Sequence, residues 1–119
     1  MELYERVRPD FEFSDTRGAL VQLVHEGYEQ VNVLTTRAGV TRGGHYHKET
    51  AEAFFVVDGR VTVGLERAGA RQAETFERGA FFRIPPHVVH TMAFEADTVL
   101  VAMYEKAVER PDGSKDIFS

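Results

Sequence analysis

The chain contains no cysteine, no tryptophan and no long apolar run. Without cysteine it can form neither a disulfide nor a thiolate zinc site, and it has no cysteine nucleophile. No stretch approaches the roughly 20 apolar residues that a membrane helix needs, so we expect no membrane partner. Residues 1–10 are charged, which argues against a signal peptide and, with the missing cysteine, favours a cytoplasmic location.

Positive charge is outnumbered by negative charge. Fourteen Lys and Arg stand against nineteen Asp and Glu, which gives a formal net charge of −5 at pH 7. We therefore expect no nucleic acid as a partner, although this composition allows a local basic pocket for a small anion. The 119 residues fit one domain, and the 43% that are hydrophobic, with nine Phe among them, can build one core.

Helical periodicity is absent from every window of the sequence. Short segments instead alternate polar and apolar residues between turn residues, a pattern typical of an all-β sandwich or barrel. We expect a core at about 18–105, an arm or edge strand at 1–13 and an irregular tail at 106–119. Strands are expected in the central stretch described next and at 19–24, 30–36, 60–66, 71–77, 80–84, 87–94 and 98–105.

Residues 39–59, GVTRGGHYHKETAEAFFVVDG, carry most of the functional information. In a strand, His45 and His47 point to the same face while the residue between them points away. Glu52 follows five residues after His47 and begins the next apolar run. The dipeptide 58–59, Asp-Gly, predicts a hairpin turn, because such a turn needs residues that tolerate positive φ. Two histidines and one glutamate from neighbouring strands can therefore converge.

The spacing of this stretch, G-x5-H-x-H-x4-E-x6-G, resembles the first motif of the cupin superfamily. Residues 79–94, GAFFRIPPHVVHTMAF, resemble the second motif. Pro85 and His90 fall at the expected positions, whereas His87 stands where that family usually has glycine. The resemblance implies a single cupin domain over residues 1–119, with the double-stranded β-helix (jelly roll) fold. Its ligand pocket is expected at the mouth of the barrel.

The same resemblance places His45, His47, Glu52 and His90 at the metal-ligand positions of cupins. A set of nitrogen and oxygen donors suits zinc, iron, nickel, cobalt or manganese and does not choose among them. We therefore expect a divalent transition metal as cofactor. The alternative is that these side chains line a polar cavity that works without metal, as in some cupins.

A second resemblance narrows the function. Residues 13–18, FSDTRG, resemble the F-x-D-x-R-G signature of nucleotide-sugar 3,5-epimerases. Residues 42–48, RGGHYHK, resemble a string in the small 3,4-ketoisomerases of deoxysugar pathways. They also resemble R-G-N-H-Y-H in the C-terminal cupin of the bifunctional capsular-polysaccharide epimerase-reductase. These resemblances imply an epimerase or ketoisomerase that acts on a nucleotide-diphosphate-linked 4-keto-6-deoxy sugar.

Such an enzyme removes a proton next to a ketone, so it needs a base and a cation or metal for the enolate oxygen. His45, Tyr104 and Lys48 are the candidate catalytic residues. Substrate binding, with guanidinium groups on the diphosphate, is expected from Arg17, Arg42, Arg83, Tyr46 and His87.

The two resemblances conflict at His45. In the metal-free epimerases, the residue at the position of His45 is the base, and a glutamine stands at the position of His47. A histidine nitrogen bound to metal cannot also take the proton. Either the site is metal-free and His45 is the base, or it holds metal and the base is Tyr104, Lys48 or His87.

Two further functions are compatible with the sequence. The four-ligand set and the many phenylalanines also suit a metal-dependent dioxygenase or lyase acting on a small organic substrate. A cupin that binds a ligand without turnover is the third interpretation. In each case we expect a homodimer, by resemblance to small cupins and because exposed edge strands need cover.

Overall fold

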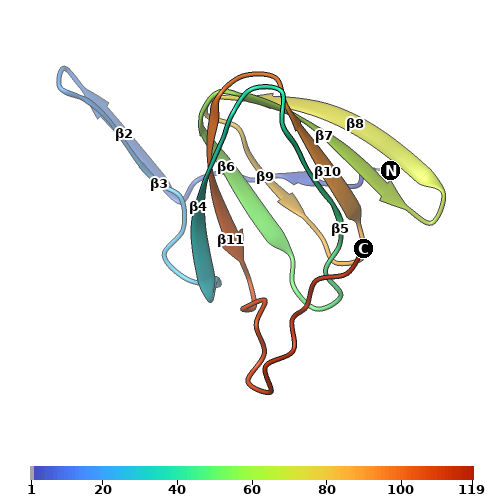
Figure 1. The fold of residues 1–119 in the computed structure, drawn as a ribbon. Helices are drawn as coiled ribbons and strands as arrows, with labels where there is room; N and C mark the ends of the chain where they lie inside the picture. The colour runs from blue at the N-terminus through green and yellow to red at the C-terminus, as the bar shows by residue number, and fades with distance from the viewer. Residues whose placement is uncertain (1) are drawn as a thin grey trace.

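The computed structural model describes residues 2–119, which form eleven strands and no helix (Figure 1). The predicted all-β class is therefore confirmed. No helix in these residues could cross a membrane. The strands are β1 (Glu5–Arg6), β2 (Phe11–Asp15), β3 (Gly18–Gln22), β4 (Gln30–Thr36), β5 (Thr41–His45), β6 (Glu52–Asp58), β7 (Arg60–Arg67), β8 (Ala70–Glu77), β9 (Phe81–Ile84), β10 (Val89–Phe94) and β11 (Thr98–Tyr104).

Two antiparallel sheets enclose the core. One has five strands in the order β1-β9-β6-β11-β4, and the other has four in the order β5-β10-β7-β8. The period-two pattern of β7 buries Val61, Val63 and Leu65 between the sheets and leaves the alternate residues toward solvent. The expected turn at 58–59 joins β6 to β7, with Gly59 at φ +102°. The result is the predicted cupin jelly roll.

Phenylalanine rings fill the barrel beneath its open end. Phe76 and Phe82 stack with their centroids 3.7 Å apart, and Phe54 lies 5.4 Å from Phe82. All three side chains are buried. The edge of Phe54 in turn contacts His90, with the ring centroids 6.3 Å apart. The aromatic core therefore packs against the polar residues of the site, through the contact between Phe54 and His90.

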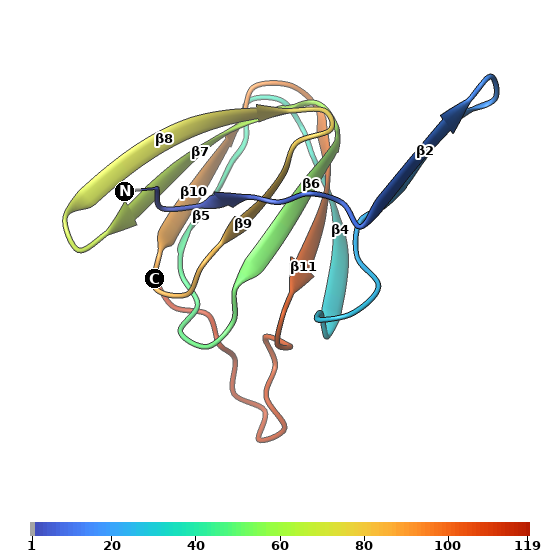
Figure 2. The same cartoon turned by 180° about the vertical axis from the view of Figure 1, so that it is seen from behind.

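The N-terminal segment differs from the expected boundaries. Leu3 and Tyr4 are buried in the core, and β1 pairs with β9, so the beginning of the predicted arm is an edge strand of the barrel. The strand expected at 19–24 lies outside the barrel, because β2 and β3 form a separate hairpin that projects from it (Figures 1 and 2). The barrel thus combines 2–6 with 30–104 rather than starting near residue 18.

Residues 106–119 form no extended strand, as expected, but they are attached to the barrel. Backbone bridges join Tyr46 to Phe118 and Glu109 to Lys115. Asp116 is 1% exposed. In Figure 1 this tail runs below the barrel and returns past the loop between β5 and β6. The tail therefore forms part of the wall at the open end.

Candidate functional site

A β-bulge at Gly43 and Gly44 sets the position of His45. His90 pairs with His45, but the next residue of β10, Thr91, pairs with Gly43, so Gly44 is the additional residue. Both glycines have positive φ, +109° and +76°. A Cβ atom on Gly43 would lie 2.6 Å from the carbonyl oxygen of His90, so only glycine permits this approach of β5 to β10. The rings of His45 and His90 consequently lie 4.6 Å apart.

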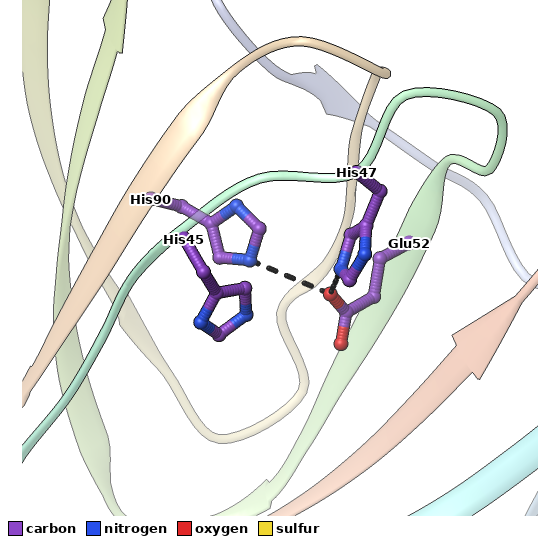
Figure 3. A group of neighbouring side chains, drawn as sticks. All are labelled: His45, His47, Glu52 and His90. Carbon is purple, nitrogen blue, oxygen red and sulfur yellow. Dashed lines mark hydrogen bonds and ion pairs between the residues drawn. The ribbon is translucent and has the colours of Figure 1, made fainter. Parts of the chain in front are cut away.

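The four predicted metal ligands meet at one place. Figure 3 shows His45 from β5, His47 from the following loop, Glu52 from β6 and His90 from β10 turned toward one another. One nitrogen or oxygen of each lies within 4.8 Å of those of the others. His47, Glu52 and His90 are buried, whereas His45 is half-buried. His45 is therefore the member of the cluster that a ligand in the barrel can reach most easily.

Glu52 supplies the negative charge of the cluster. Its Oε1 lies 3.0 Å from Nε2 of His47 and 3.4 Å from Nε2 of His90. Burial alone would raise the pKa of Glu52, but the interactions with the two histidines outweigh it and hold the pKa at about 2. The carboxylate is therefore ionised at neutral pH.

The histidines differ in their charge preference. Burial works against the charged form of His47, but the Glu52 carboxylate and the carbonyl of Asp116 outweigh it and raise the pKa of His47. For His45, burial lowers the pKa, and the neighbouring His90 lowers it further. His45 is thus a neutral imidazole at neutral pH, which is the form able to accept a proton.

A cavity of about 340 Å³ lies beside the cluster, between the two sheets. His45 reaches it from the four-stranded sheet and Tyr104 from the five-stranded sheet. Burial raises the pKa of Tyr104, and the charge of Glu52 raises it further, so the phenol keeps its proton. The cavity is lined by Leu34, Arg42, Gly43, His45, Glu52, Phe54, His90, Met92 and Tyr104.

A second cavity of about 520 Å³ adjoins the first and shares Tyr104 with it. The tail forms one side of it, with Lys115 and Glu109, and Gln30 and Asn32 of β4 lie on another. A larger share of the lining of this second cavity is polar or charged than in the inner cavity. The sequence did not predict this second cavity, because the tail has no periodic pattern that would indicate packing against the barrel.

Of the three arginines expected at the diphosphate, only Arg42 lines the inner cavity, where its Nε donates to Thr36 Oγ1 at 3.0 Å. Arg83 instead forms ion pairs at 2.9 Å with both Glu5 and Glu105. It shares the outward side of β9 with Phe81, whereas Phe82 and Ile84 face the core. Arg83 is therefore on the wrong face for a ligand in the barrel.

Arg17 lies at the tip of the projecting hairpin, where it pairs with Asp15 at 2.5 Å. Its side chain is 84% exposed. The hairpin points away from the barrel in both views (Figures 1 and 2). The structure therefore does not bring Arg17 to the cavity of its own chain.

Three other expected site residues also lie outside both cavities. The ammonium group of Lys48 is 4.2 Å from the ring centroid of Phe118, and the ring of Tyr46 packs against Phe118 too. His87 is exposed and has φ +70°, which explains why glycine is usual at this position in the family. Its backbone N–H donates to the carbonyl of His47 at 2.7 Å, so its observed contact is made by the backbone.

The paired sheets and the histidine-glutamate cluster between them define a cupin jelly roll. The sequence matches the family described as "Polysaccharide biosynthesis C-terminal domain" over residues 13–113, and the chain belongs to that family. This family membership agrees with the resemblance to the C-terminal cupin of the capsular-polysaccharide enzyme.

One relative in sequence is the UDP-2-acetamido-2,6-beta-L-arabino-hexul-4-ose reductase of Pseudomonas aeruginosa. It is 43% identical over 72 residues, which are 60% of this chain and 17% of that protein. The chain thus corresponds to a small part of that relative.

Solved structures share the fold. A variant of a 3,4-ketoisomerase from Thermoanaerobacterium thermosaccharolyticum, in complex with TDP-4-keto-6-deoxyglucose, has a TM-score of 0.81 and 17% identity over 99% of this chain and 88% of that one. The dTDP-4-dehydrorhamnose 3,5-epimerase of Sulfolobus tokodaii has a TM-score of 0.73 and 22% identity over 86% and 70%. At these identities the likeness concerns the fold.

Proposed function

We propose that the chain is an epimerase or ketoisomerase that removes a proton next to the ketone of a nucleotide-diphosphate-linked 4-keto-6-deoxy sugar. The observation that carries this proposal is the inner cavity, which His45 lines from one sheet and Tyr104 from the other. A neutral imidazole on one side and a protonated phenol on the other are what inversion at carbon requires. The relatives named above, which act on nucleotide sugars, support the same substrate class over a dioxygenase, a lyase or a binding protein.

In this mechanism, His45 takes the proton from carbon, and the electron pair of the C–H bond moves to the ketone oxygen, forming an enolate. The cation of Arg42, which lines the cavity, stabilises the oxygen charge. Tyr104 then delivers a proton to the opposite face of the carbon, which inverts the centre. Proton transfer within the enediol would instead move the ketone along the ring.

The outer compartment suits the remainder of the substrate. It adjoins the inner cavity at Tyr104, so a sugar in the inner cavity can extend its diphosphate toward Lys115 and the amides of Gln30 and Asn32. Arg42 lines the inner cavity and not the outer compartment, so we assign it to the enolate oxygen, and Lys115 is the cation available to the diphosphate. The ion pairs of Arg83 argue against that role for it.

Proton NMR in deuterium oxide tests this function. The protein is incubated with thymidine- or uridine-diphosphate 4-keto-6-deoxyglucose, and the ring protons are followed. Loss of the signal at carbon 3 or 5 is expected and identifies the carbon attacked. No exchange with either nucleotide, from protein verified as folded and supplied with zinc, iron, nickel or manganese, would contradict the proposal. Dioxygen uptake would then be the next measurement.

As the alternative to a metal-free site with His45 as the base, we propose that His45, His47, Glu52 and His90 hold a divalent transition metal, in which case a residue other than His45 takes the proton. The donor set fits, and among the described residues the buried Nε2 of His90 forms no hydrogen bond, only the 3.4 Å ion-pair contact with Glu52 Oε1. Such an ion would act as a Lewis acid toward the enolate oxygen. Metal analysis of protein purified without a histidine tag is expected to give near one equivalent. Less than about a tenth of an equivalent of any transition metal would contradict a working site.

The proposed homodimer rests on exposed apolar strands. Phe11 and Leu20 of the hairpin are 53% and 55% exposed, and Val33 of the edge strand β4 is 68% exposed. An isolated two-stranded hairpin is marginally stable in water, so a partner that covers it is favoured. A role for Arg17 in diphosphate binding then requires the cavity of the partner. Sedimentation is expected to give about twice 13.4 kDa, and a mass near 13.4 kDa would contradict the dimer.

A further inference from the structure

Asp116, in the C-terminal tail, is a buried carboxylate with an unusual set of partners. Its side chain accepts backbone hydrogen bonds from Lys48 at 2.8 Å, Glu49 at 2.9 Å and Thr50 at 3.1 Å. These are the three residues that directly follow His47 in the chain. One tail side chain, distant in sequence, therefore fixes the loop that carries a member of the histidine cluster.

The backbone of Asp116 also contacts the imidazole itself. Its carbonyl oxygen lies 2.5 Å from Nδ1 of His47, and a carbonyl can only accept a hydrogen bond, so Nδ1 carries the proton. The other nitrogen, Nε2, faces Glu52 at 3.0 Å. The ring is thus held at both ends, with Nε2 directed into the cluster. This arrangement is the usual way in which an outer residue sets the orientation of a functional histidine.

The tail is held in register on both sides of Asp116. The backbone N–H of Asp116 donates to Val108 at 2.8 Å, and Phe118 and Tyr46 exchange two backbone hydrogen bonds of 2.9 and 3.0 Å. The guanidinium of Arg110 lies 3.4 Å from the carboxylate. These contacts therefore hold the Asp116 carbonyl in a fixed position against His47.

We propose that Asp116 is a positioning residue of the site, which holds the loop at 48–50 and keeps the proton on Nδ1 of His47. Its effect on turnover rests on the proposed function, but its effect on the His47 ring does not. A residue that only stabilised the fold would leave the state of the imidazole unchanged in the folded protein. The two roles can therefore be separated by observing the ring directly.

The test compares Asp116→Ala and Asp116→Asn with a matched control, Asp112→Asn. Asp112 is exposed in the same tail, and within residues 2–119 its side chain accepts hydrogen bonds from Ser114 alone. In ¹⁵N-labelled protein we expect a slowly exchanging Nδ1–H proton on His47. The alanine variant keeps the carbonyl at 116 but releases the loop at 48–50 that follows His47, so this proton should lose its protection there. It should keep part of its protection in the asparagine variant and be unchanged in the control. The asparagine oxygen can still accept some of the loop N–H groups, which makes it the conservative rescue.

Turnover is measured on the same proteins. We expect kcat of Asp116→Ala to fall at least about tenfold with little change in KM, in line with other residues that orient a functional histidine. A protected His47 proton in folded Asp116→Ala would overturn the proposal, even if the melting temperature fell. If the alanine variant does not fold, the asparagine variant decides, and protection of the His47 proton equal to that of the wild type would overturn the proposal. If the wild-type chain shows no sugar exchange, the proposed function fails, but the imidazole signal still tests Asp116.

Discussion

Replacing His45 with asparagine is expected to lower the rate of solvent-deuterium exchange at the sugar by about 100-fold or more, since general-base catalysis contributes about 10²–10⁴-fold. Asparagine keeps much of the shape and polarity of the side chain but cannot accept the proton. The change should leave the fold intact, because His45 is only half-buried and lines a cavity. Proton NMR in deuterium oxide measures the rate, and circular dichroism verifies the fold.

The same variant separates the two roles of His45. Loss of exchange with wild-type metal content identifies the base, and a parallel loss of metal identifies a ligand. His25→Asn is the matched control, because His25 is an exposed histidine that pairs with Asp10 away from the cavity. Exchange within tenfold of wild type in His45→Asn would contradict a role for His45 in the chemistry.

His47→Gln extends this test, because glutamine is the residue expected here in the metal-free epimerases. If the proposed metal is required, this variant loses both metal and exchange. Exchange that continues at the wild-type rate would contradict the metal requirement and leave His45 as a free base.

The fold was predictable because its signals are local. Period-two alternation located most strands, and the Asp-Gly pair at 58–59 located the turn between β6 and β7. The meeting of His45, His47, Glu52 and His90 followed from the resemblance to the cupin spacing. In the structure, β5 and β10 are neighbours in one sheet, and Glu52 comes from β6 of the other sheet. Such sequence patterns specify which face of a strand each residue occupies, and this information was sufficient to predict the cluster.

The remaining site residues depended on geometry that residue type does not encode. Arg83 is on the outer face of β9. The sequence of the short apolar segment 80–84 could not predict this orientation, because both faces of the strand are largely buried. Lys48 and Tyr46 are neighbours of the ligands in sequence, yet they contact Phe118 of the tail. The docking of the tail through Asp116 depends on backbone hydrogen bonds to residues more than 60 positions away, for which the sequence has no signal.

The Gly43 bulge leads to the second large expected effect. Gly43→Ala should lower the free energy of unfolding by about 1–3 kcal/mol more than Gly44→Ala, the cost of inserting a methyl group into a packed site. A Cβ atom at Gly43 would lie 2.6 Å from the carbonyl oxygen of His90 and 3.0 Å from Cα of Thr91, whereas one at Gly44 meets nothing within 4 Å. Both positions have positive φ, so both variants carry backbone strain.

Urea unfolding of the two alanine variants gives this difference directly. Because the clash pushes β5 away from β10, Gly43→Ala should also separate His45 from His90 and slow sugar exchange more than Gly44→Ala does. Measured under conditions in which both variants are folded, the exchange rates then report geometry and not unfolding. Equal stability and equal exchange in the two variants would contradict the idea that the close approach at Gly43 builds the site. Gly43 and Gly44 of the R-G-G-H string would then be needed only for the backbone conformation of the bulge.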